Sequence, residues 1–280
     1  MTPSTFSYLT GIVRARSGGV IGPDQGYMLE TRLAPVLKRE GLAGLDALAE
    51  RLKRPGSEAL AQEMTELLTT NESSFFRDGK PFEHLRSLLP RLHAARPPGQ
   101  ALRIWSAACS TGQEAYSISI TFAELAEKDP GLRARPLEII GTDITTAVLR
   151  RARAGIFTQF EVQRGLPIRT LMTRFIQEEG GRWKVKPEIA APCRFENFNL
   201  LGDPRGLGRF DVIFCRNVLI YFDVPTKGRV LAGLARQLAP DGALYLGAAE
   251  TAIGVTSALA ALPGERAVYG PVGEPQRLRA

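Results

Sequence analysis

The stretch IWSAACSTGQEAYSI, residues 104–118, determines which fold the chain is expected to adopt. Apolar Ile104 and Trp105 form part of a strand, small residues follow, and Gly112 stands just before a predicted helix. Dinucleotide-binding folds use such a turn, with three glycines that let backbone N–H groups approach a pyrophosphate. This turn contains a single glycine. It therefore indicates a ligand held at the end of a strand without a phosphate cradle.

Composition allows one large domain plus a small one, since the chain has 280 residues of which 44% are apolar. The net charge of +7 comes from basic residues spread along the chain, which suits an acidic protein surface and is weak support for nucleic-acid binding. The N-terminus has no signal-peptide pattern, and no apolar run approaches the ~20 residues that span a bilayer. We expect a cytoplasmic protein without membrane insertion.

Cysteine and histidine contents limit the chemistry. The three cysteines, Cys109, Cys193 and Cys215, form no CxxC pair, so neither a disulfide framework nor a metal site is expected. Cys109 and Cys215 are interpreted as small buried apolar residues. The only histidines, His84 and His93, lie on one predicted helix. The chain therefore has few histidines that could act in catalysis.

Two patterns divide the chain. Residues 1–69 show apolar positions at helical spacing and predict a small all-helical domain. Residues 70–280 alternate apolar strands with helices, which predicts an α/β domain with a mostly parallel sheet. A segment at about 158–194 breaks this alternation, and its EEGG turn predicts a β-hairpin within an inserted antiparallel subdomain. Ligands on parallel sheets bind at the carboxyl ends of the strands.

Polar residues follow four predicted strands. Glu114 lies in the first turn, and Asp143 ends the second strand, where an acid can accept hydrogen bonds from ribose hydroxyls. Alternatively, Asp143 only caps the next helix. Asn199–Leu200 follows another strand, and Asn199 either reads an adenine edge or is a turn residue. Arg216–Asn217 comes directly after the apolar run VIFC, so these polar groups need partners or a ligand.

The segment TTNESSFFRD, residues 69–78, joins the two predicted domains. It combines polar Asn71 and Ser73, two phenylalanines and basic Arg77, a composition unusual for a linker, and we interpret it as part of the site. No phosphate-binding lysine or three-glycine turn accompanies these residues. The expected ligand therefore has a ribose and a base but little phosphate. S-adenosylmethionine fits, with its methionine half close to the small-residue turn and its ammonium near Glu114.

Taken in order, TTNESSFFRD, RIWSAACSTGQEAYSI, IIGTDITTAVLRRARAGIF, FNLL and FDVIFCRNVLIYFD closely resemble the chemotaxis receptor methyltransferases, the CheR family. The resemblance covers nearly the whole chain and implies a Rossmann-like class I methyltransferase sheet. Ser73 and Gln113 depart from the threonine and glutamate frequent in that family. The resemblance implies that the cofactor is held by Asn71, Ser73, Arg77, Glu114, Asp143, Asn199, Leu200, Arg216 and Asn217.

The resemblance also implies the reaction, transfer of a methyl group from S-adenosylmethionine to glutamate carboxylates of chemoreceptors, with S-adenosylhomocysteine as product. A glutamate is already ionised at neutral pH, so no general base is needed. Arg77 and Tyr221 match residues near the reacting centre and are the expected catalytic residues.

The expected partner is the cytoplasmic methylation region of a chemoreceptor. The resemblance assigns its binding to a basic helix carrying Arg32, Lys38 and Arg39, which Pro35 is expected to interrupt; an ordinary solvated face is the alternative. The short EEGG hairpin predicts independence of a receptor C-terminal pentapeptide. A monomer is expected.

Three other classes are less well supported. An amino-directed nucleic-acid methyltransferase would carry a proline-containing [DNS]PP[YF] stretch where this chain has RNVLIYF. A non-catalytic adaptor is expected to lack Asp143 or Arg77, and both are present. A nicotinamide dehydrogenase would need the missing phosphate-binding turn.

Overall fold

The computed structural model describes residues 1–272 and leaves the last residues of the predicted C-terminal domain, 273–280, outside the description. The chain divides into two compact units. The smaller unit contains Met1–Thr70 and the short segment Tyr221–Lys227, and the larger contains Asn71–Ile220 and the residues from Gly228 onward. Independent folding of the predicted domains 1–69 and 70–280 remains a prediction.

The smaller unit is helical, as the sequence predicts. Its core consists of side chains at helical spacing, such as Leu29, Leu33 and Met64, which are fully buried. Pro35 does not interrupt its helix, contrary to the prediction, because the helix continues to Arg39. The helices are α1 (Pro3–Ser17), α2 (Gly26–Arg39), α3 (Leu45–Leu52) and α4 (Glu58–Leu68), with a 3-10 turn η1 (Pro23–Gln25) before α2.

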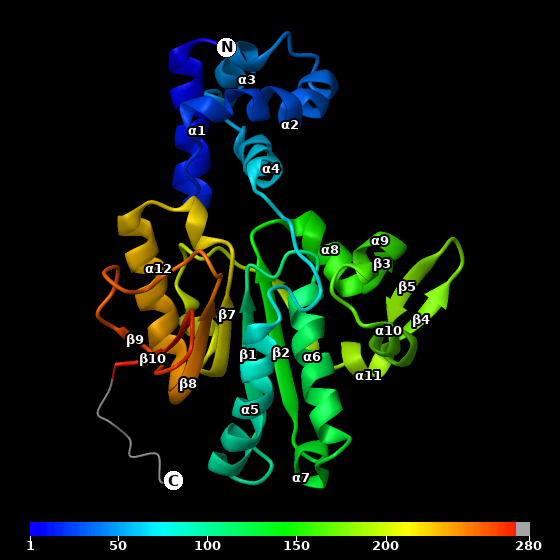
Figure 1. Cartoon of the computed structure of the whole chain (residues 1–280). Helices are drawn as coiled ribbons and strands as arrows, with labels where there is room; N and C mark the ends of the chain where they lie inside the picture. The colour runs from blue at the N-terminus through cyan, green and yellow to red at the C-terminus, as the bar shows by residue number, and fades with distance from the viewer. Residues whose placement is uncertain (273–280) are drawn as a thin grey trace. The chain divides into compact units, whose positions relative to one another are not determined.

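The larger unit is built on a seven-stranded sheet with the strand order β6-β2-β1-β7-β8-β10-β9 (Figure 1). The first five strands in that order pair in parallel, and β10 is antiparallel to both of its neighbours. This confirms the predicted α/β class. The strands are β1 (Leu102–Ala107), β2 (Leu137–Asp143), β6 (Cys193–Asn197), β7 (Phe210–Cys215), β8 (Leu238–Leu246), β9 (Leu259–Ala261) and β10 (Val268–Pro271).

Helices pack against this sheet, and α6 is buried along most of its length. The single glycine of the decisive turn, Gly112, has a φ of 94°. A Cβ atom there would lie 3.1 Å from the Cβ of Ala152 in α8, so the glycine serves both the turn and close helix packing. The helices are α5 (Lys80–Ala95), α6 (Gln113–Ala126), α7 (Pro130–Arg133), α8 (Thr146–Ala154) and α12 (Val224–Gln237), with 3-10 turns η2 (Pro204–Leu207) and η3 (Leu219–Tyr221).

The sequence TKGRVLAGLARQLAPDG, residues 226–242, carries a Pro–Asp–Gly signal that by itself predicts a helix ending there. Helix α12 ends at Gln237, and β8 already begins at Leu238, so that Pro240 and Asp241 belong to the strand. Leu238 pairs with Phe210, and a register shift follows before the regular pairing resumes. Pairing with β7 therefore overrides the local turn signal. Across residues 1–272, no helix combines the length and apolar composition needed to cross a membrane.

The inserted segment forms a three-stranded antiparallel sheet in the order β3-β5-β4, which includes the predicted EEGG hairpin. Phe75 of the junction segment is fully buried, with its ring centroid 4.9 Å from that of Phe157 and 5.5 Å from that of Phe175. A Cβ atom on Gly165 would lie 1.9 Å from the carbonyl oxygen of Phe75. The insertion contains β3 (Ile156–Thr158), α9 (Gln159–Gln163), α10 (Ile168–Arg174), β4 (Phe175–Glu178), β5 (Arg182–Val185) and α11 (Pro187–Ala190).

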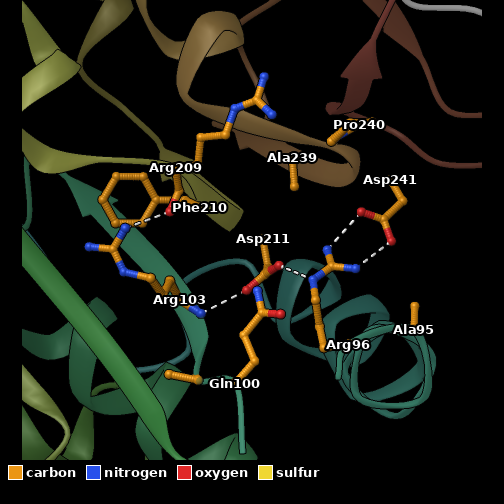
Figure 2. Close-up of a pocket in the computed structure, with 11 residues that line it drawn as sticks. Ala95, Arg96, Gln100, Arg103, Arg209, Phe210, Asp211, Ala239, Pro240 and Asp241 are labelled. Atoms are coloured by element: carbon orange, nitrogen blue, oxygen red, sulfur yellow. Dashed lines mark hydrogen bonds and ion pairs between the residues drawn. The ribbon is translucent and has the colours of Figure 1, made fainter. Parts of the chain in front are cut away.

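A polar network lies at the amino ends of β1 and β7, around a hollow of about 450 Å³ (Figure 2). Arg96 donates to Asp211 Oδ1 at 2.6 Å and to both oxygens of Asp241 at 2.7 and 2.8 Å. Asp211 Oδ2 accepts from the backbone N–H of Arg103 at 2.8 Å. These hydrogen bonds tie the chain after α5 to β1, β7 and β8. The network is therefore a structural feature at the edge opposite the carboxyl ends of the strands.

The Arg96–Asp241 pair predicts a pH-dependent contribution to stability. Hydrogen bonding to Arg96 lowers the pKa of Asp241 in the folded protein. The ion pair therefore makes its full contribution to the free energy of unfolding above the ordinary carboxyl pKa of about 3.9. That contribution is lost as the pH falls through the lower pKa that Asp241 has in the folded protein. We expect Asp241→Asn to reduce the free energy of unfolding by about 1–3 kcal/mol at pH 7, measured by urea denaturation, and by less at pH 3.

The matched control is Glu178→Gln, which removes a partner that lies 3.9 Å from Lys184. Its effect should stay within about 0.5 kcal/mol. If Asp241→Asn lowered the free energy of unfolding by the same amount at pH 7 and at pH 3, the assigned ion pair would be contradicted.

Candidate active site

The predicted site residues of the larger unit lie at the carboxyl ends of adjacent parallel strands. Ala107 at the end of β1 is in register with Thr142 of β2 and Cys215 of β7, and Asp143 is in register with Asn197 of β6. The loops after these four strands therefore meet at one edge of the sheet, where ligands of parallel sheets bind (Figure 1).

Asp143 is buried at this edge and accepts two backbone hydrogen bonds. The N–H of Ser110 donates to Oδ2 and that of Thr145 to Oδ1, each at 2.9 Å. The N-cap of α8 is Thr145, so Asp143 is not simply the cap of that helix. These two backbone donors fix the plane of the carboxylate. The geometry suits an acid that accepts from ligand hydroxyls.

Glu114 and Arg216 form the second polar centre. Glu114 accepts from the Ser106 hydroxyl at 2.7 Å and from Arg216 at 3.1 Å. Burial raises the pKa of Glu114, whereas Arg216 and Ser106 act in the opposite direction. The Arg216 side chain, 2% exposed, also donates to Asp78 Oδ2 at 2.6 Å and to the carbonyl of Arg77 at 2.9 Å. One buried cation thus joins three loops of the site.

The junction segment contacts the same edge. The Ser110 hydroxyl donates to the carbonyl of Asn71 at 2.7 Å, and Arg164 of the insertion pairs with Glu72 at 2.9 Å. Arg77 and Ser73 are half-buried, and an Arg77 Nη1 donates to the carbonyl of Glu72 at 3.3 Å. The junction therefore packs against this edge of the sheet and is not a free linker.

Backbone strain is concentrated at this edge. Six non-glycine residues in the described chain have positive φ, and five of them lie in the junction or in the loops after β1 and β7. Such conformations cost about 1–3 kcal/mol each and persist only where the surroundings hold them. The five are Phe76 (47°), Asp78 (67°), Ala108 (63°), Ser110 (52°) and Asn217 (59°).

The loop after β6 contains Asn199 and Leu200. Asn199 Oδ1 accepts from the N–H of Leu201 at 3.0 Å, which confirms that Asn199 is a turn residue. Leu200 lines a hollow of about 650 Å³ together with Trp105 and Phe198. Whether the Asn199 amide also reads an adenine edge stays a prediction.

The remaining predicted residues belong to the smaller unit. Tyr221 is 37% exposed in its 3-10 turn. Arg32 donates to the carbonyls of Leu67 and Thr69 at 3.4 and 3.0 Å, and Arg39 forms two hydrogen bonds with Glu63. Arg32 and Arg39 thus have structural contacts of their own. Their role in receptor binding, like that of Lys38, stays a prediction.

Sequence reasoning missed three polar residues of the edge. Ser106 and Asp78 hold Glu114 and Arg216, and Glu250 follows β8 and accepts backbone hydrogen bonds from the loop after β7. The strand β8 stops at Leu246, before Glu250. Glu250 therefore lacks the strand-end position that marks Asp143, and no local signal in the sequence identifies it.

The order of the strands, the acid at the end of β2 and the small-residue turn after β1 are those of a class I methyltransferase fold, which uses S-adenosylmethionine. Residues 71–268 match the family described as "CheR methyltransferase, SAM binding domain", and the chain belongs to this family. The residues present fit the cofactor: two buried carboxylates flank a turn whose small side chains leave the backbone accessible.

Three relatives extend the match over most of the chain. The chemotaxis protein methyltransferase Cher2 of Pseudomonas putida is 37% identical over 85% of this chain and 86% of its own length. Chemotaxis protein methyltransferase 1 of Pseudomonas aeruginosa is 39% identical over 83% and 85%. The chemotaxis protein methyltransferase of Vibrio parahaemolyticus is 38% identical over 87% and 88%. The match thus reaches beyond the cofactor-binding domain.

Asp143 provides the sharpest test of the site. We expect Asp143→Asn to weaken binding of S-adenosylhomocysteine by about 10- to 100-fold, because hydrogen bonds to a charged acceptor are lost. Isothermal titration measures this dissociation constant. Glu138→Gln, near the other end of β2, is the control and should leave it within about twofold. Equal affinities for wild type and Asp143→Asn would remove Asp143 from the site.

Proposed function

We propose that this protein transfers the methyl group of S-adenosylmethionine to glutamate side-chain carboxylates of chemoreceptors, giving glutamate methyl esters and S-adenosylhomocysteine. The reaction would serve adaptation in chemotaxis signalling. The observation that carries the proposal is 37–39% identity to chemotaxis protein methyltransferases along more than four-fifths of the chain. The buried acids at the strand ends support it, because they suit a cofactor with ribose hydroxyls and an ammonium group.

Each part of the cofactor has a proposed partner at the site edge. Asp143 would accept from the ribose hydroxyls, and Glu114 would face the ammonium group, which favours its ionised form. Asn199–Leu200 and Arg216–Asn217 would hold the adenine side, and Asn71, Ser73 and Arg77 would close the junction over the ligand. S-adenosylmethionine supplies an activated methyl group, and its transfer to a carboxylate forms one C–O bond, breaks one C–S bond and moves no proton.

The protein's task in this reaction is to desolvate and orient the receptor carboxylate. That carboxylate is ionised at neutral pH, so the site needs no general base. Arg77 is half-buried in the junction, and its guanidinium can pair with a carboxylate while that group loses water. We assign Arg77 and Tyr221 to orienting the substrate. Positioning of this kind is a major source of rate enhancement.

The proposed partner surface is the helix α2, with Arg32, Lys38 and Arg39, facing an acidic receptor helix in the cytoplasm. The net charge of +7 favours such an encounter. The Arg39–Glu63 pair reduces the free charge of this surface, which makes Lys38 its most available cation. We propose a monomer that does not require a receptor C-terminal pentapeptide and binds no nucleic acid.

Methyl-ester formation tests the reaction directly. Incubation with tritiated S-adenosylmethionine and a chemoreceptor fragment should label the fragment, and alkali should release the label as methanol, since esters hydrolyse and N-methyl groups do not. Glutamine in place of the methylated glutamates should abolish labelling. Alkali-stable label, or label on nucleic acid, would refute the proposed substrate.

Replacement of Arg77 tests the orientation role. We expect Arg77→Met to lower kcat by about 100-fold or more, because a charge that orients the carboxylate is removed. Arg77→Lys should recover part of the loss, as it keeps the charge without the planar fork. Arg169→Met, an exposed arginine of α10, is the control and should leave kcat within about twofold. An unchanged kcat in Arg77→Met would contradict the role.

The hairpin prediction has its own test. Receptor fragments with and without a C-terminal pentapeptide should be methylated at the same kcat/KM, because the EEGG turn leaves only a short loop between β4 and β5. A loss of about tenfold or more on truncation would show that the insertion binds the peptide.

A further inference from the structure

Glu250 is a buried acid at the same edge of the sheet as the active site. It lies in the turn after β8, is 8% exposed, and its side chain folds back on that turn. Oε2 accepts from the N–H of Asn217 at 2.9 Å and of Gly247 at 2.6 Å. Oε1 accepts from the N–H of Val218 at 2.9 Å and of Ile220 at 3.2 Å. One carboxylate therefore receives four backbone hydrogen bonds.

Three of these donors come from the partly buried loop after β7, and Glu250 supplies the acceptor for each of these N–H groups. Among the residues that the structure describes, no lysine or arginine forms a salt bridge with Glu250. The backbone dipoles supply the positive potential, as in other anion-binding turns. A neutral glutamine in the same place would offer one acceptor oxygen and turn an NH₂ group toward the remaining donors.

The loop held in this way is strained and tightly packed. Asn217 has a φ of 59°, a conformation that a non-glycine residue keeps only when its surroundings enforce it. A Cβ atom on Gly247 would lie 2.7 Å from Glu250 Oε2 and 2.8 Å from Asn217 Nδ2. The turns after β7 and β8 thus fit together with no space for an additional methyl group.

The same loop begins with Arg216, whose guanidinium contacts Glu114 and Asp78. We propose that Glu250 is a positioning residue of the methyltransferase site: it fixes the Arg216–Asn217 turn and through Arg216 sets the orientation of the Glu114 carboxylate. The proposal rests on the cofactor-binding role assigned above to these residues. Glu250 acts without touching the reacting groups.

A purely structural role is the competing explanation, and the chain contains a matched control for it. Asp211 is also a buried carboxylate, 6% exposed, and it accepts from Arg96 and from a backbone N–H at the opposite edge of the same sheet. Asp211→Asn should therefore destabilise the fold without reaching the cofactor. Comparing the two variants separates a loss of stability from a loss of site geometry.

The experiment measures the dissociation constant for S-adenosylhomocysteine by titration and the melting temperature of wild type, Glu250→Gln and Asp211→Asn. We expect Glu250→Gln to weaken binding by about 10- to 100-fold, since several hydrogen bonds to a charged acceptor are lost. Asp211→Asn should leave binding within about twofold while lowering the melting temperature. Unchanged binding in Glu250→Gln, or equal weakening in both variants, would overturn the positioning role.

Gly247→Ala decides the question if Glu250→Gln does not fold. Its added methyl group displaces the Glu250 carboxylate without removing it and should weaken binding by about tenfold; unchanged binding would overturn the proposal. The two proposals can fail separately. If the wild type binds S-adenosylhomocysteine and Glu250→Gln weakens that binding, the positioning role of Glu250 is supported. If no receptor is methylated in the same preparation, the proposed substrate is wrong.

Discussion

The buried guanidinium of Arg216 is the interaction on which the arrangement of the site depends. It contacts Glu114 after β1 and Asp78 of the junction, while Arg216 itself follows β7. Removing water from one cation and one acid is costly unless both are paired with good geometry. Here the cost is offset because the same ion links three separate segments. Parallel strand pairing brings the loops to one edge, and Arg216 sets how they face one another.

Strain and support are distributed unequally over the sheet. The carboxyl edge contains five left-handed residues, whereas the amino edge contains the Arg96–Asp211–Asp241 network, in which one arginine pairs with two acids. Such a division is expected when one edge must present polar groups to a ligand and the other must only hold the strands together. A substitution at the carboxyl edge should therefore affect ligand binding more than a substitution at the amino edge, which should mainly affect the stability of the fold.

Much of the fold could be predicted from local patterns. Apolar strands alternating with helices indicate the parallel sheet, and the EEGG turn indicates the hairpin. The local patterns failed where tertiary pairing overrides them: Pro240 and Asp241 look like a helix stop, yet they lie within β8, at the register shift between its two regions of pairing with β7. Pro35 lies inside α2, because the buried face of the helix outweighs a single lost hydrogen bond.

The candidate site residues were likewise predictable only where local sequence position marks them. Asp143 and Arg216 stand at strand ends, and Glu114 begins the helix after the small-residue turn, so these three candidates could be proposed from their positions in the sequence. Asp78 and Glu250 could not, since their partners are backbone groups and an arginine far away in the sequence. Periodicity says nothing about which loop a side chain folds back on.

Gly165 has a consequence for how genetic data on this protein should be interpreted. Any side chain there meets the carbonyl of Phe75, whose ring fills the space between Phe157 and Phe175. A displaced Phe75 moves the segment that also carries Asn71, Ser73 and Arg77. A saturation screen for inactive alleles would therefore mark Gly165 as strongly as a ligand-contacting residue, and a map of the site drawn from that screen would extend too far into the insertion.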